Sequence, residues 1–99
     1  MKRDDKTDEN AAVIHIDSEV EKGVYCNAAN IAHSPSEFIL DFIIVLPGDR
    51  KKVVSRILTS PVHAKQLTAA LVRNIEKYEK TYGEVDAGMK GPEFEGPVN

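Results

Sequence analysis

Between residues 13 and 59, apolar side chains recur mostly at every second position, which is the period of β-strands. Turn-forming residues interrupt this pattern at Ser34-Pro35-Ser36 and at Pro47-Gly48. Links this short favour antiparallel neighbours, because parallel pairing needs a crossover of about a dozen residues or more. The pattern therefore predicts strands at residues 13–16, 24–33, 37–46 and 53–59.

The period changes after Ser60, which is a favourable helix N-cap and is followed by Pro61 at the first helical position. Gly83 is a typical residue for the end of the helix. The spacing predicts a helix over residues 61–82 with one apolar stripe, made of Ala64, Leu67, Leu71, Ile75, Tyr78 and Tyr82. We therefore expect an α+β fold: an antiparallel meander of three to four strands, followed by one long C-terminal helix packed on one sheet face.

The predicted strand at residues 37–46 is apolar on both faces, whereas a half-solvated antiparallel strand alternates apolar and polar residues. One face carries Phe38, Leu40, Phe42, Ile44 and Leu46. The opposite face carries Ile39, Asp41, Ile43 and Val45. One helix covers one face, and each large apolar side chain left in water forgoes roughly 1.5–3 kcal/mol.

A second subunit is the expected cover for the remaining face, so we predict a homo-oligomer with a dimer favoured. The candidate interface residues are Ile39, Asp41, Ile43, Val45 and Arg56. The alternative is that the first predicted strand or the C-terminal tail of the same chain folds over this face.

Asp41 stands on an otherwise apolar strand, and a buried carboxylate must be paired or hydrogen-bonded. Arg56, on the following strand, is a plausible cross-strand partner. We therefore predict an ion pair that fixes the strand register or lines the subunit interface. The alternative is an exposed edge aspartate that blocks aggregation.

The chain has 99 residues, a mass of 10.9 kDa and a formal net charge of −3, which fits a single domain. Both ends are polar, and the last residues are rich in glycine, proline and carboxylates. We expect disordered tails at residues 1–10 and 85–99 around one domain at residues 11–84. No run approaches the roughly 18 apolar residues needed to span a bilayer, so we expect a cytoplasmic protein that does not contact a membrane.

Few residues invite catalytic or metal chemistry. His15, His33 and His63 lack the clustered spacing of a metal site. Cys26 is the single cysteine, and on one strand it would project opposite to His33, seven residues later. We therefore expect no catalytic residues, no metal and no cofactor.

Arg50, Lys51 and Lys52 form the only basic cluster of the predicted domain. They are candidate anion or phosphate contacts. A basic turn of three residues is usually a solvated turn, and the negative net charge argues against a general nucleic-acid binder.

The run from His33 to Phe42 is distinctive, as are the segments at residues 46–48 and 60–65. Over residues 13–85 the chain resembles a family of short bacterial and archaeal proteins that is known only as a domain of unknown function. The resemblance implies a domain boundary, and it implies no reaction, ligand or catalytic residue.

We therefore expect a non-enzymatic, homo-oligomeric module that presents its sheet edge or second face to a protein partner. One alternative is a chaperone-like binder of extended polypeptide, since strands followed by a helix are similar at fold level to the secretion chaperones of the SecB type. The other is an accessory protein of transcription or another nucleic-acid machine that contacts phosphate through the basic cluster.

Overall fold

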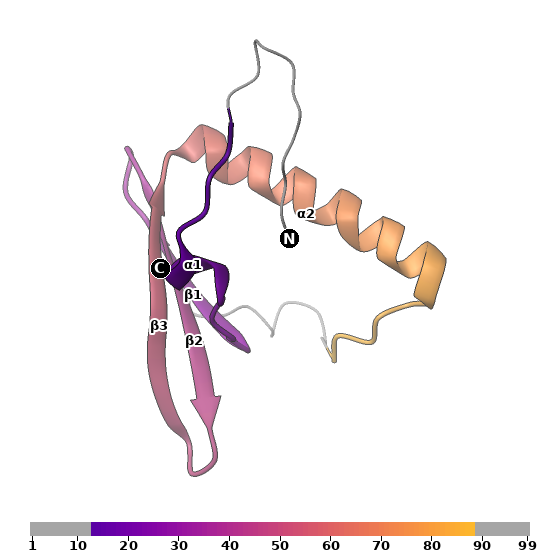
Figure 1. Ribbon diagram of the computed structural model, residues 1–99, viewed down its shortest axis with the longest axis horizontal. Helices are drawn as coiled ribbons and strands as arrows, with labels where there is room; N and C mark the ends of the chain where they lie inside the picture. Colours follow the sequence, from indigo (N-terminus) through magenta and orange to yellow (C-terminus); the bar gives the residue numbers. More distant parts are fainter. Residues whose placement is uncertain (1–12, 89–99) are drawn as a thin grey trace.

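The computed structural model describes residues 13–88. Its strands form one antiparallel sheet in the order β1-β2-β3, and a long helix follows the last strand (Figure 1). This arrangement confirms the predicted α+β class. The elements are α1 (Ser18–Glu21), β1 (Ala28–His33), β2 (Phe38–Leu46), β3 (Arg50–Thr59) and α2 (Pro61–Tyr82).

The prediction of a first strand at residues 13–16 is wrong. These residues form no regular element, and Val13 and Ile14 are exposed to solvent. The apolar alternation is too short to hold a strand without a neighbouring strand to bond to. The chain instead makes the single turn α1, which ends before Gly23 turns the backbone with a φ of 77°.

The predicted second strand begins later than expected, because the side chain of Asn27 takes over the role of a backbone neighbour. Its Nδ2 donates to the carbonyl of Val45 at 3.3 Å, and its Oδ1 accepts from the Val45 N–H at 2.8 Å. The Asn27 N–H also donates to the carbonyl of Ile43. Regular β1 pairing starts only with Ala28, opposite Ile43.

The last strand begins earlier than expected, because the turn between β2 and β3 is tight. Gly48 and Asp49 both have positive φ, at 79° and 62°, so the chain reverses at once and Leu46 pairs with Arg50. The register then shifts between Phe42 and Ile43, which leaves Val54 as the extra residue of a bulge in β3.

The two faces of β2 differ in their polarity, since alternate side chains point to opposite sides of the sheet. We call one the aromatic face; in β2 it consists of Phe38, Leu40, Phe42, Ile44 and Leu46. We call the other the polar-row face; in β2 it consists of Ile39, Asp41, Ile43 and Val45. On β3 the pairing places Ile57 beside Leu40 on the aromatic face, and Arg56 beside Asp41 on the polar-row face.

The long helix begins and ends as predicted. The Oγ of Ser60 accepts a hydrogen bond from the His63 N–H at 3.0 Å, and Pro61 occupies the first turn. Gly83, at a φ of 102°, ends the helix and donates its N–H to the carbonyl of Glu79. No helix within residues 13–88 has both the length and the hydropathy needed to cross a membrane.

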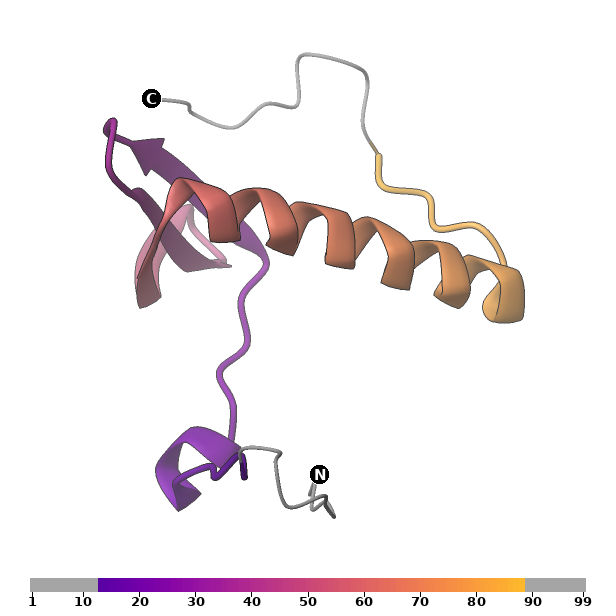
Figure 2. The same ribbon diagram turned by 90° about the horizontal axis from the view of Figure 1, so that it is seen from above.

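The helix does not pack across the sheet of its own chain, contrary to the prediction. It leaves the end of β3 and extends well beyond the sheet, as both views show (Figures 1 and 2). Within the described part of the chain, extensive packing is limited to β1 on β2 and β2 on β3. The physical reason lies in the connection, because Ser60 alone separates the strand from the helix.

As a result, residues 13–88 of one chain form no hydrophobic core. None of these residues is buried, and the large apolar side chains of the helix stripe, Leu67, Leu71, Ile75, Tyr78 and Tyr82, are exposed to solvent. The radius of gyration is 16.6 Å, whereas a compact domain of about 100 residues has a value of about 13 Å. The fold of the single chain is therefore a sheet and a helix held apart.

The N-cap of α2 offers a direct test of this local structure. Ser60→Ala removes the acceptor for the His63 N–H and should lower the free energy of unfolding by about 1 kcal/mol. Ser60→Asp keeps an acceptor at the cap and should melt close to the wild type. Equal stability of all three proteins in thermal denaturation followed by circular dichroism would contradict the cap.

Candidate interaction surface

The predicted pairing of Asp41 with Arg56 is present and is bidentate. The two residues are direct cross-strand neighbours on β2 and β3. Arg56 Nε donates to Asp41 Oδ1 at 2.7 Å, and Arg56 Nη2 donates to Asp41 Oδ2 at 2.8 Å. The carboxylate side chain is 13% exposed and the guanidinium side chain 63% exposed. The pair thus ties the two strands in register from the polar-row face.

These hydrogen bonds change the acidity of the carboxyl group. They lower the pKa of Asp41 below its ordinary value of 3.8, and the positive charge of Arg56 adds to the effect, outweighing the partial burial that opposes it. The pKa of Arg56 is raised for the same reason. Asp41 is therefore ionised at every pH at which the protein is expected to work.

Asn30 completes a polar row across all three strands, and the sequence patterns did not identify it. It lies on β1 opposite Asp41, which in turn faces Arg56 on β3. Its Oδ1 atom is buried and accepts no hydrogen bond from any described residue. Its position can be found only from the register of β1 on β2, because this pairing places the Asn30 amide beside the ion pair.

The other candidate interface residues flank this polar row, so the sheet brings all of them together on one face. Ile39 lies between Ala32 and Leu58, and Ile43 lies beside Val53. Ile39 and Ile43 are half-buried, while Val45 near the hairpin end is exposed. The face is therefore apolar around one central ion pair, with Lys51 beside Val45 at the hairpin end.

The basic cluster lies at the opposite end of the sheet from the start of α2. Arg50 Nε donates to the carbonyl of Pro47 at 3.3 Å, and Lys51 Nζ lies 3.8 Å from a carboxylate oxygen of Asp49. Alternation along β3 sends Lys51 to one face and Arg50 and Lys52 to the other. The three residues thus surround the hairpin end without converging on one point.

The histidines and the cysteine lie on different segments: His15 precedes α1, Cys26 precedes β1, His33 ends β1, and His63 is in the first turn of α2. The ring of His33 stacks on Phe38 with 5.5 Å between the ring centroids, and His63 Nδ1 is hydrogen-bonded to Thr59 Oγ1 at 2.8 Å. Cys26 is half-buried ahead of β1. Among residues 13–88 no three histidine, cysteine or carboxylate side chains gather in a group that could hold a metal ion.

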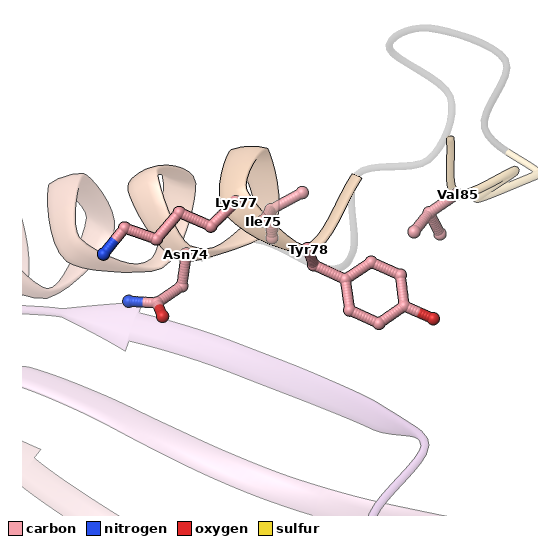
Figure 3. Close-up of a pocket in the computed structure, with 5 residues that line it drawn as sticks. All are labelled: Asn74, Ile75, Lys77, Tyr78 and Val85. Carbon is pink, nitrogen blue, oxygen red and sulfur yellow. The ribbon is translucent and has the colours of Figure 1, made fainter. Parts of the chain in front are cut away.

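An open hollow of about 550 Å³ lies at the C-terminal end of α2 (Figure 3). The segment after the helix is held near it, because the Val85 N–H donates to Glu79 Oε2 at 2.9 Å. Tyr78 also contacts Tyr82, with ring centroids 4.9 Å apart. The hollow continues the apolar stripe of the helix; it is lined by Asn74, Ile75, Lys77, Tyr78 and Val85.

Fold and surface together define a small α+β chain with open apolar faces. The chain belongs to a family of proteins of unknown function, DUF3467, whose model matches residues 1–87. The match starts at the first residue, so it is wider than the resemblance over residues 13–85. Comparison with curated proteins and with solved structures finds no match.

The ion pair predicts a defined dependence of stability on pH. Asp41 has a lower pKa in the folded chain than in the unfolded chain, so the pair stabilises the fold fully above pH 3.8. This contribution is lost as the pH falls through the folded pKa. Asp41→Asn should therefore lower the melting temperature by several degrees at neutral pH, and the difference from wild type should shrink in acid.

Glu37→Gln is the matched control, because within the described chain the Glu37 carboxylate makes no hydrogen bond or ion pair. It should melt like the wild type at neutral pH. Thermal melts of the three proteins across the acid range check the prediction. An Asp41→Asn protein as stable as wild type at neutral pH would show that the pair does not stabilise the sheet.

Proposed function

We propose that this chain is a non-enzymatic, homo-oligomeric interaction module of the cytoplasm, with the dimer as its basic unit. The observation that carries the proposal is the combination of an ordered sheet and helix with no buried residue among 13–88. Association with a second copy supplies the core that one chain lacks.

Energetics support this reading. Fixing one residue of backbone costs roughly 1–2 kcal/mol, and burial of apolar side chains is the main term that offsets it. Along α2, Leu71 is 56% exposed and Tyr78 51% exposed. A helix that is half apolar gains most of its stability from packing of that apolar stripe. A partner surface is therefore part of what stabilises this helix.

The polar-row face is the surface that we propose for a further protein partner. Its charged groups already satisfy each other, because Arg56 and Asp41 form two hydrogen bonds. The face can therefore meet water or a partner without an unpaired charge. Ile39 and Ile43 flank this pair on the same face, and a polar group within an apolar contact adds specificity.

Solution mass tests the self-association. Light scattering after gel filtration should give at least twice the chain mass of 10.9 kDa. Leu71→Glu places a charge in the middle of the helix stripe and should shift the protein to monomer and lower its helix content. Ala69→Glu, on the opposite side of the same helix, should leave the mass unchanged.

A wild-type protein that is monomeric at all accessible concentrations would overturn the proposal. Equal masses of the Leu71→Glu protein and the wild type would show that the stripe is not part of the association surface.

A further inference from the structure

We propose that α2 of one copy lies along the aromatic face of a second copy, and that the second helix does the same in return. The product is a two-fold, helix-exchanged dimer. The proposal rests on the self-association proposed above and names the two surfaces that meet.

The first argument is the connection between strand and helix. Ser60 is the only residue between Thr59 and Pro61, whereas strand–helix connections usually have about two to six residues. Ser60 is extended, with a φ of −81° and a ψ of 159°, and the following proline disfavours any helical alternative. The chain therefore has no freedom at this point to fold α2 back onto its own sheet.

Side-chain contacts hold the junction in this form. Thr59 Oγ1 is hydrogen-bonded to His63 Nδ1 at 2.8 Å, so the last residue of β3 is tied to the first turn of α2. Ser60 caps the same turn and accepts the Ala64 N–H on its carbonyl. Thr59 pairs with Phe38 and so belongs to the aromatic face. The helix thus starts on the aromatic side of the sheet, although it does not cover the aromatic face of its own chain.

The two surfaces match in length and chemistry. The 22 residues of α2 span about 33 Å, and the nine residues of β2 span about 30 Å. The helix offers one apolar stripe within a narrow arc. The aromatic face offers five apolar side chains on β2, without the charged pair that interrupts the opposite face.

Charge favours one orientation of the helix on the second sheet. On the second sheet, α2 would run antiparallel to β3, from the Thr59 end towards the β2–β3 turn. Exchange of helices between two copies keeps the orientation that α2 would have on its own sheet. The C-terminal region of α2 and the segment after it are acidic, with Glu76, Glu79, Glu84 and Asp86 against Lys77 and Lys80. They would meet the basic turn, which carries Arg50, Lys51 and Lys52.

A second copy fits both surfaces. Each copy has one exposed apolar stripe on α2 and one half-buried aromatic face on its sheet, so a two-fold pair covers both at once and leaves neither over.

Cross-linking between differently marked chains tests the arrangement. In a Cys26→Ser background, one chain carries Leu40→Cys on the aromatic face and the other, of a different tagged length, carries Leu71→Cys on α2. The chains are unfolded together, refolded and treated with a short bismaleimide. The proposal predicts a cross-linked product that contains one chain of each length. Ala69→Cys in place of Leu71→Cys should give little of it.

Other products would overturn the proposal and keep self-association. Cross-linking of Leu40→Cys chains to each other would show stacked aromatic faces, and cross-linking of Leu71→Cys chains to each other would show paired helices. A monomeric mass for the unmodified protein would instead overturn the proposed function itself.

A longer connection gives an independent test. Inserting about four Gly and Ser residues before Ser60 brings the link to an ordinary length for a strand–helix connection and should let α2 close on its own sheet. The variant should run as a monomer with unchanged helix content by circular dichroism. If the insertion variant remains a dimer, the proposed exchange of helices is wrong. The mass of the wild-type protein separately shows whether the chain self-associates.

Discussion

The connection between β3 and α2 is the constraint on which the rest of the structure depends. One extended residue followed by proline sets the direction in which the helix leaves the sheet, and the Thr59–His63 hydrogen bond keeps it there. Because the helix leaves the sheet in this direction, its apolar stripe stays exposed and the half-buried aromatic face is not covered by the helix of the same chain. The absence of a core in one chain therefore follows from a short, rigid junction and not from a shortage of apolar residues.

The polar-row face behaves differently from the rest of the apolar surface. Its ion pair is satisfied within the chain, and its register fixes β2 against β3. A face of this kind is compatible with exposure in the dimer that we propose, whereas the aromatic face is not. The two faces of one strand thus suit two different neighbours: a second copy on one side and solvent or a further partner on the other.

Much of this structure could be predicted from the sequence where the signal is local. The Ser60-Pro61 start, the Gly83 end, the antiparallel meander and the Asp41–Arg56 pair all follow from residue chemistry and spacing. Residues 13–16 have strand periodicity but find no neighbouring strand. The place of Asn30 in the polar row can be known only once the register of β1 on β2 is known. Of the predicted tails at residues 1–10 and 85–99, residues 1–10 and 89–99 lie outside the described residues, whereas residues 85–88 form no regular element and the Val85 N–H donates to Glu79 Oε2. The position of α2 depends on connection length, which periodicity does not encode.

The central claim is that folding of this chain is coupled to its association with a second copy. The most direct test is the thermal midpoint of the unmodified protein, measured by circular dichroism over a wide range of protein concentrations. Coupled folding and association predicts a midpoint that rises steadily with concentration. A sharp, cooperative transition at the same temperature throughout that range would contradict the account.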